Sequence, residues 1–190
     1  MTPRLNFPPA LLLQAQGPDF GMKAAIFDVD GVLTDGRIYI GEHGETVKAF
    51  ATLDGHGIKL LARAGITPIV ITGRDSAAVR RRVADLGIAH AVYGAGDKLA
   101  AAQAVLQQMG LDWPEVAAMG DDWPDLPLLT RAGFACAPAQ AHVEVRAVVH
   151  HVTAAHGGHG AAREFCDLLL VAAGRYAGLL AEHLGTLDAK

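Results

Sequence analysis

Short apolar runs alternate along this chain with stretches of helical spacing, and this alternation limits the fold more than any other feature. The runs are rich in Val, Ile and Ala and lack polar alternation, which is typical of strands that are covered on both faces. They are residues 24–27, 67–71, 89–93, 116–119, 133–136 and 148–152. Strands alternating with helices predict an α/β fold in which helices flank a Rossmann-like parallel sheet.

The expected helices lie between these runs, and a glycine closely follows each of them. The helical stretches with amphipathic spacing are residues 58–64, 76–86, 98–109 and 125–131. A left-handed residue after the last turn of a helix favours glycine, so the expected C-caps are Gly65, Gly87, Gly110 and Gly133. Beyond Ala161 the pattern is again helical, with a further helical piece at 176–184.

One segment departs from this order. Residues 36–50 read as two short alternating strands, 37–40 and 46–50, around a glycine-bounded turn, which predicts a β-hairpin inserted after the first strand. The hairpin is too small to be a second domain. We expect residues 1–20, which contain four prolines, to form a leader, and residues 21–190 to form a single domain.

Composition excludes some classes of partner. The formal net charge is −4 and no block of Lys and Arg is present, which argues against nucleic acid and anionic membranes as partners. No apolar run approaches the ~18 residues that a membrane span needs. Cys136 and Cys166 are expected to be buried free thiols, although a disulfide remains open on their number alone. These features together predict a cytoplasmic protein.

Polar side chains follow several of the predicted strands where those strands end. In open parallel sheets, ligands bind at the carboxyl ends of the strands. Asp28 and Asp30 follow the first strand, and Gly31 allows the chain to turn after Asp30, so that the two carboxylates can take different roles. The other residues expected at this edge are Thr72, Gly73, Arg74, Lys98, Asp121, Asp122 and Asp125.

Such a concentration of carboxylates is costly unless a cation neutralises it. Mg²⁺ prefers oxygen ligands and is the usual choice for a site of this kind. Beside a metal, Lys98 offsets the charge on phosphoryl oxygens, Thr72 donates a hydrogen bond and a carboxylate attacks in line. Phosphoryl transfer asks for little beyond this positioning and electrostatic stabilisation. The sequence therefore predicts a magnesium-dependent phosphatase.

The segments that carry these residues resemble, in order and spacing, the four signature motifs of the haloacid dehalogenase superfamily. A closer resemblance, over residues 23–170, is to 3-deoxy-D-manno-octulosonate 8-phosphate phosphatases. It rests on residues 28–34, 35–39, 48–50, 54–58, 71–74, 120–125 and the late glycine loop 157–164. The resemblance implies a haloacid dehalogenase-like fold with a hairpin in place of a cap domain. It also implies a homotetramer in which a neighbouring subunit helps to close the site.

The same resemblance implies roles for individual residues. Asp28 is the nucleophile and Asp30 the general acid and base, while Thr72 and Lys98 hold the phosphoryl oxygens. The Mg²⁺ ligands are Asp28, the main-chain carbonyl of Asp30, and Asp121, with Asp122 or Asp125 in support. Substrate contacts are expected from Lys48, Asp54, Gly73 and Arg74.

Structural alternatives to these substrate roles stay open. Arg74 could instead brace the following helix, and Lys48 could be a solvated hairpin charge. Asp54 could simply begin a helix, and the glycine loop 157–160 is as consistent with a tight turn as with an anion cradle. His150, His151, His156 and His159 match no familiar zinc pattern and are expected in loops or at the surface.

Two departures from the family pattern bear on the substrate. Leu53 and His159 stand where arginines are expected, which removes positive charge that could meet a sugar-acid carboxylate. Hydrolysis of the eight-carbon acid phosphate is the first expectation, and a related nine-carbon acid phosphate is the alternative. From other classes, a non-catalytic oligomerisation module would have little reason to keep Asp28, Asp30, Lys98 and Asp121, and a mutase would normally need a cap.

Overall fold

The chain forms a six-stranded, fully parallel sheet, as the alternation of strands and helices predicts. The computed structural model describes residues 21–185, so the expected leader lies outside the described residues. The strand order is β5-β4-β1-β6-β7-β8, with β1 at the point where the connections diverge to the two sides. The strands are β1 Ala24–Phe27, β4 Thr67–Ile71, β5 His90–Val92, β6 Val116–Met119, β7 Phe134–Ala137 and β8 His151–Val152.

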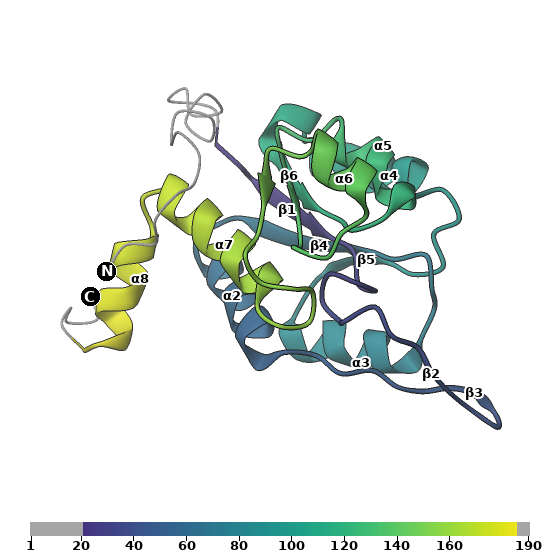
Figure 1. Ribbon diagram of the computed structural model, residues 1–190. Coiled ribbons are helices and arrows are strands. Elements are labelled where there is room, and N and C mark those ends of the chain that lie inside the picture. The colour runs from purple at the N-terminus through teal and green to yellow at the C-terminus, as the bar shows by residue number, and fades with distance from the viewer. Residues whose placement is uncertain (1–20, 186–190) are drawn as a thin grey trace.

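Helices cover both faces of the sheet. Ala25 and Phe27 of β1 point into one apolar cluster and Ala24 and Ile26 into the other, and all four are buried. One face carries α2 Thr52–Arg63, α3 Ala77–Leu86 and α7 Ala161–Ala172, and the other carries α4 Lys98–Met109, α5 Leu126–Leu129 and α6 Val143–Val148 (Figure 1). The short turns η1 Trp113–Glu115 and η2 Trp123–Asp125 flank β6, and α8 Tyr176–His183 follows α7.

Strand register brings the polar residues together. Phe27 at the end of β1 is level with Val70 of β4 on one side and Met119 of β6 on the other. The Asp28 N–H donates to the Met119 carbonyl oxygen over 3.1 Å. The segments that leave β1, β4 and β6 therefore emerge side by side at one edge of the sheet, where parallel sheets bind ligands.

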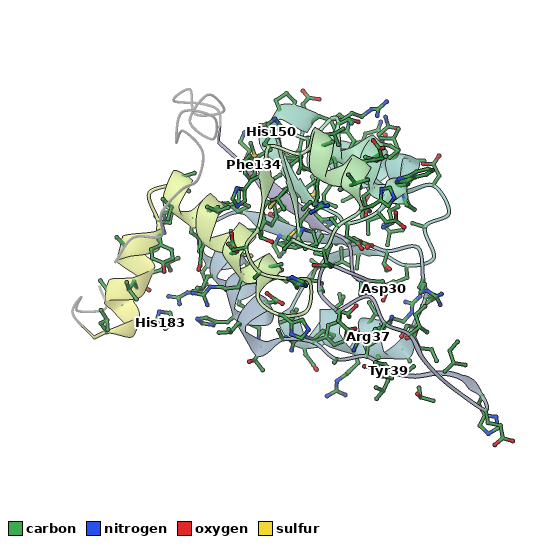
Figure 2. The ribbon with its side chains drawn as sticks, in the orientation of Figure 1. Asp30, Arg37, Tyr39, Phe134, His150 and His183 are labelled. Carbon is green, nitrogen blue, oxygen red and sulfur yellow. The ribbon has the colours of Figure 1, made fainter. Side chains whose placement is uncertain are left out.

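The expected hairpin is present between β1 and α2. Its strands, β2 Tyr39–Gly41 and β3 Gly44–Val47, are antiparallel and extend away from the body of the molecule (Figure 1). Arg37 lies on the segment that leads from the loop of Asp30 to the hairpin, and Tyr39 is the first residue of β2 (Figure 2). Tyr39, Ile40 and Val47 are exposed on this arm.

The first helix begins earlier than predicted. Residues 52–57 belong to α2, whose N-cap is Ala51, so Asp54 lies in the first turn of the helix and does not begin it. Two glycines of this segment allow close packing. A Cβ at Gly55 would lie 2.2 Å from an Arg82 nitrogen, and one at Gly57 would lie 2.9 Å from Arg163. Tertiary packing here overrides the low helix propensity of glycine.

Two predictions near the end of the sheet were also wrong. Residues 148–152 are not a continuous strand, because Val148 ends α6 and only His151–Val152 pairs with β7. Gly133 does not adopt a left-handed conformation, whereas Gly65, Gly87 and Gly110 do. A Cβ at Gly133 would lie 2.2 Å from the Pro114 carbonyl oxygen, so close approach of two backbones is the reason for glycine there.

The C-terminal helix folds back on the body. The predicted helical piece 176–184 is confirmed as α8, which meets α2 through an Arg63–Glu182 ion pair of 2.5 Å and a contact between the rings of His56 and His183. Both cysteines are buried and free, as expected. Over residues 21–185, no helix has the length and apolar character that crossing a membrane requires.

Candidate active site

A cavity of about 430 Å³ opens at the carboxyl ends of β1, β4 and β6. All nine residues predicted for this edge line it, together with further residues of the loops after β1, β5 and β6. The lining residues are Asp28, Asp30, Gly36, Thr72, Gly73, Arg74, Ala95, Gly96, Lys98, Asp121, Asp122, Pro124 and Asp125. The residues predicted at the carboxyl ends of the strands therefore lie together around one cavity.

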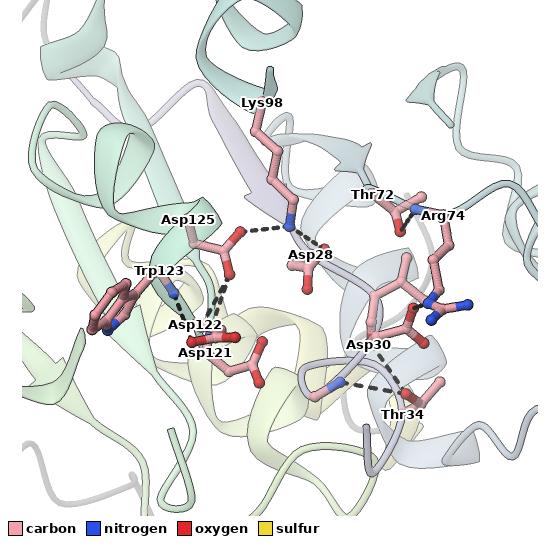
Figure 3. A network of polar contacts seen from close by, with 12 residues as sticks. Asp28, Asp30, Thr34, Thr72, Arg74, Lys98, Asp121, Asp122, Trp123 and Asp125 are labelled. Carbon is pink, nitrogen blue, oxygen red and sulfur yellow. Dashed lines mark hydrogen bonds and ion pairs between the residues drawn. The ribbon is translucent and has the colours of Figure 1, made fainter. Parts of the chain in front are cut away.

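Lys98 holds two carboxylates together at the base of this cavity (Figure 3). Its Nζ donates to Asp28 Oδ1 over 2.6 Å and to Asp125 Oδ1 over 2.7 Å, and all three residues are buried. The second oxygen of Asp125 accepts the N–H groups of Asp121 at 3.0 Å and Asp122 at 3.3 Å. Asp125 thus fixes the loop after β6 against Asp28.

The carboxylates outnumber the single lysine. Asp28, Asp121 and Asp125 each place an oxygen within 4.8 Å of the other two. Burial, followed by the charge of Asp125, raises the pKa of Asp28 to about 7 against the lowering effect of Lys98. Burial, followed by the charges of Asp28 and Asp125, raises the pKa of Asp121 to about 8. An oxygen-rich site with this much uncompensated charge fits a divalent cation such as Mg²⁺.

The turn after β1 separates the environments of Asp28 and Asp30. Gly31 has a φ of +90°, and a Cβ there would lie 2.0 Å from Asp121 Oδ2, so only glycine fits. The Thr34 hydroxyl oxygen accepts the N–H groups of Gly31 at 3.4 Å and Gly36 at 3.2 Å, which closes the turn. Asp28 consequently faces Lys98, while Asp30 faces away from it (Figure 3).

Arg74 faces Asp30 from the end of β4. Its side chain is 53% exposed, and its Nε lies 3.8 Å from Asp30 Oδ2. Thr72 is buried, and its hydroxyl accepts the Arg74 N–H over 3.4 Å. Ser76, not Arg74, occupies the N-cap of α3. Arg74 therefore lines the cavity with a half-exposed side chain, and the N-cap position of α3 belongs to another residue.

Lys48 lies beside the cavity without lining it. Its side chain is buried, and its Nζ forms an ion pair with Asp30 Oδ1 and lies 3.3 Å from Glu45 Oε2. The interpretation of Lys48 as a solvated hairpin charge is therefore wrong. Its ammonium group instead contacts Asp30, the predicted general acid and base.

Asp54 lies apart from the cavity. It is buried, and its Oδ1 accepts the N–H of Arg163 over 2.8 Å, while its Oδ2 accepts that of Gly160 over 3.4 Å. These N–H groups belong to the start of α7 and have no partner within that helix. The predicted substrate contact at Asp54 is replaced by a cap that joins α2 to α7.

We expect Asp54→Ala to lower the free energy of unfolding by about 1–2 kcal/mol, the usual cost of losing a capping side chain. Urea unfolding followed by circular dichroism measures this change. Asp54→Asn is the matched control, because it keeps an acceptor oxygen and should lose less. Equal stability of Asp54→Ala and the unaltered chain would contradict the capping role.

The glycine loop 157–160 supports the turn after β1. Its Gly158 N–H donates to the Val32 carbonyl oxygen over 3.0 Å, and a Cβ at Gly157 would lie 1.8 Å from the Gly31 carbonyl oxygen. Gln140, which sequence reasoning missed, donates to that oxygen over 2.7 Å and accepts the Gly157 N–H over 2.9 Å. The loop is thus a tight docking turn. No sequence pattern marks Gln140, because its partners are backbone groups of distant segments.

His150 and His151 have structural partners, and the expected loop or surface position is wrong for His151, which is buried in β8. His150 Nδ1 accepts the Ala135 N–H over 2.9 Å, beside Phe134 (Figure 2). His151 Nε2 lies 3.3 Å from Glu164. Within residues 21–185, the Asp28, Asp121 and Asp125 group is the one place where three or more potential metal-binding side chains converge.

Comparison with known proteins finds likenesses of three kinds, to a family model, to a curated relative and to solved structures. A family model described as a haloacid dehalogenase-like hydrolase matches residues 92–165. The 3-deoxy-D-manno-octulosonate 8-phosphate phosphatase of Haemophilus influenzae is 44% identical over 154 residues, which are 81% of this chain and 86% of that protein.

Two solved structures share the fold at similar identity. A probable phosphatase from Pseudomonas syringae superposes with a TM-score of 0.82 at 48% identity, covering 89% of this chain and 94% of that one. The 3-deoxy-D-manno-octulosonate 8-phosphate phosphatase of Moraxella catarrhalis superposes with a TM-score of 0.83 at 39% identity, covering 85% and 93% respectively. That structure is a complex with a magnesium ion, a phosphate ion and a KDO molecule.

Proposed function

This chain belongs to the 3-deoxy-D-manno-octulosonate 8-phosphate phosphatase family of haloacid dehalogenase-like hydrolases, and from that premise we propose that it hydrolyses this sugar-acid phosphate with Mg²⁺. The observation that carries the proposal is the buried Asp28 carboxylate, which Lys98 fixes beside Asp121 at the base of the cavity. The products are the free sugar acid and inorganic phosphate, and the intermediate is an aspartyl-phosphate on Asp28.

In the first step, an Asp28 carboxylate oxygen forms a bond to phosphorus. The bond from phosphorus to the sugar oxygen breaks, and Asp30 gives its proton to that leaving oxygen. Lys98 and the Thr72 hydroxyl are placed to hold phosphoryl oxygens, because both line the cavity next to Asp28. Asp30 suits the proton transfer, since it lines the cavity and is not one of the carboxylates that Lys98 binds.

In the second step, water attacks phosphorus and Asp30 takes its proton. The bond between phosphorus and Asp28 breaks, which releases phosphate and restores both carboxyl groups. Asp28, Asp121 and the main-chain carbonyl of Asp30 would hold the metal. Asp125 supports the site without binding the metal, because both its carboxylate oxygens already accept hydrogen bonds from Lys98 and the Asp121 backbone. Asp122 caps η2 by accepting the Trp123 N–H. Bound Mg²⁺ supplies electrostatic stabilisation of the charge that develops on the phosphoryl oxygens.

We further propose that Arg74 and the Gly73 backbone contact the substrate, since both line the cavity and the Arg74 guanidinium is half exposed. Leu53 and His159 are exposed and do not line the cavity, so the missing arginine charges are not lost from the cavity itself. We also propose a cytoplasmic homotetramer. Its support is the exposed apolar arm of Tyr39, Ile40 and Val47, which a soluble chain would be expected to cover.

Phosphate release from a panel of sugar phosphates, with Mg²⁺ and with EDTA, tests the proposed function. The panel contains the eight-carbon 3-deoxy acid phosphate, the nine-carbon acid phosphate and hexose phosphates. We expect magnesium-dependent release with a clear preference for the eight-carbon acid. Preference for the nine-carbon acid phosphate would make that compound the assigned substrate and would leave the mechanism unchanged. No release from any compound, by a folded protein, would favour a non-catalytic module.

Asp121→Asn should weaken Mg²⁺ binding while stabilising the metal-free protein at high pH. Changes to residues that merely support a metal ligand cost about 10–100-fold in affinity, and loss of a ligand itself should cost at least as much. The pKa of Asp121 rises from 3.8 to about 8 on folding. The folded state therefore holds this proton more tightly than the unfolded state does, and the stability that the proton contributes is lost progressively as pH rises from 3.8 to about 8.

Calorimetric Mg²⁺ titration and thermal unfolding in EDTA at pH 5 and pH 9 measure both effects. The variant should unfold at the higher temperature at both pH values, by a small margin at pH 5 and by a larger margin at pH 9. Each kcal/mol is worth roughly 2–4 °C in a chain of this size. A lower unfolding temperature for the variant at pH 9 would contradict the charge repulsion inferred around Asp28, Asp121 and Asp125.

A further inference from the structure

Lys48 is a charged residue of the hairpin arm whose side chain is closed off from solvent. It directly follows β3, and its side chain has no exposed surface. The ammonium group forms ion pairs with Asp30 on the catalytic turn and with Glu45 on the hairpin itself. Removing one member of a buried ion pair is strongly unfavourable. Lys48 does not line the cavity, and its ammonium group would have to leave these ion pairs to contact a substrate there.

Glu45 extends these contacts to the body of the protein. Its Oε1 accepts a hydrogen bond from the Ser76 hydroxyl over 2.7 Å, and Ser76 is the N-cap residue of α3. A continuous chain of polar contacts therefore runs from the start of α3 through Glu45 and Lys48 to the carboxyl group of Asp30. The hairpin, which has no buried strand of its own, is held against the body at this point.

The two cations that face Asp30 differ in freedom. Lys48 contacts Oδ1 from a buried position, whereas the Arg74 Nε lies 3.8 Å from Oδ2 on a side chain that is 53% exposed. One oxygen of Asp30 is therefore anchored by a group that cannot reach solvent. The other oxygen lies beside the half-exposed Arg74 side chain, which lines the cavity. A proton donor must stay within hydrogen-bond reach of the leaving oxygen, so this anchoring bears on catalysis.

We propose that Lys48 is a positioning residue that orients the Asp30 carboxyl group for proton transfer to the leaving oxygen, and that it makes no contact with the substrate. The inference rests on the proposed phosphatase function but does not depend on which sugar is hydrolysed. It assigns the hairpin a role within its own subunit, since the orientation of the proton donor depends on how the hairpin docks against α3.

The test compares kcat/KM of Lys48→Met on three phosphate esters with Mg²⁺ present. The first is 4-nitrophenyl phosphate, whose leaving group departs without a proton. The second is a neutral sugar phosphate with an alkyl leaving group, and the third is the eight-carbon sugar-acid phosphate. Because kcat/KM reports the steps up to departure of the leaving group, it isolates the proton transfer from the later hydrolysis of the intermediate. Lys59→Met, which removes an exposed lysine of α2, is the matched control.

We expect kcat/KM of Lys48→Met to fall about 10–100-fold on both alkyl esters, as is usual when a supporting residue is lost. On the aryl ester kcat/KM should fall by less than about threefold. Lys48→Arg, which keeps the charge, should recover most of the loss. Lys59→Met should match the unaltered chain on all three esters. If Lys48→Met does not fold, Glu45→Gln, which weakens the second anchor of Lys48, should show the same pattern with a smaller loss.

Other outcomes would overturn the inference in recognisable ways. A loss confined to the sugar-acid phosphate would make Lys48 a contact for the substrate carboxylate. Equal losses on the aryl and alkyl esters would make its role purely structural. If the unaltered chain released phosphate from none of the esters, the proposed function itself would fail, and the positioning role with it.

Discussion

Asp28→Asn should abolish phosphate release from every ester while leaving the fold intact. The amide is a far weaker nucleophile than the carboxylate, so the covalent step has no substitute in the cavity. Lys98 keeps its ion pair with Asp125, and the excess negative charge of the site falls by one. Steady-state phosphate release and circular dichroism measure the two effects.

The matched control for this variant is Asp85→Asn, which removes an exposed carboxylate from α3. It should retain full activity. The effect of Asp28→Asn on the metal-free fold has a definite sign. Burial raises the pKa of Asp28 from 3.8 to about 7, so the Asp28 carboxyl group makes the folded state progressively less stable as pH rises between these two values. Substantial residual turnover by a well-folded Asp28→Asn protein would refute Asp28 as the nucleophile.

Asp30→Asn should lower turnover of the sugar-acid phosphate by on the order of 10²–10⁴, the usual share of general acid–base catalysis. The amide can neither protonate the leaving oxygen nor take a proton from water. The Lys48 and Arg74 cations would then face a neutral group. Initial rates at saturating substrate and Mg²⁺ measure the change.

Asp35→Asn is the matched control on the same turn, where Asp35 accepts the Arg37 N–H over 3.0 Å. Its turnover should stay close to that of the unaltered chain. A loss of less than tenfold in Asp30→Asn would mean that another group carries the proton. A loss as complete as that of Asp28→Asn, on aryl as well as alkyl esters, would point instead to a collapse of the turn.

The central strands could be predicted closely from the sequence because both their faces are buried. The bounds of β1, β4 and β6 match the predicted residues, since a strand covered on both sides reads as an uninterrupted apolar run. By contrast, α6 was missed, because the valines at 143, 145 and 148 favour strands and the helix has six residues. Its start depends on the His142 side chain, which accepts the Glu144 N–H over 3.3 Å.

The candidate site divides in the same way. Asp28, Thr72 and Asp121 follow from strand-end reasoning, because strand register brings them to one edge, and Lys98 reaches the same cavity from the start of α4. The contacts of Lys48 and Asp54 could not be predicted from the sequence. Each contacts groups that are distant in sequence, Asp30 for Lys48 and the start of α7 for Asp54. Such contacts depend on how the hairpin and helices dock, which no local pattern records.

Trapping of a phosphorylated Asp28 tests the covalent mechanism most directly. The enzyme is mixed with Mg²⁺ and the eight-carbon sugar-acid phosphate, quenched in acid within milliseconds, digested and examined by mass spectrometry. We predict one added phosphoryl group on the peptide that contains Asp28, absent in EDTA and absent from Asp28→Asn. Rapid turnover with no phosphorylated peptide at any quench time, or a phosphoryl group on another residue, would contradict the account.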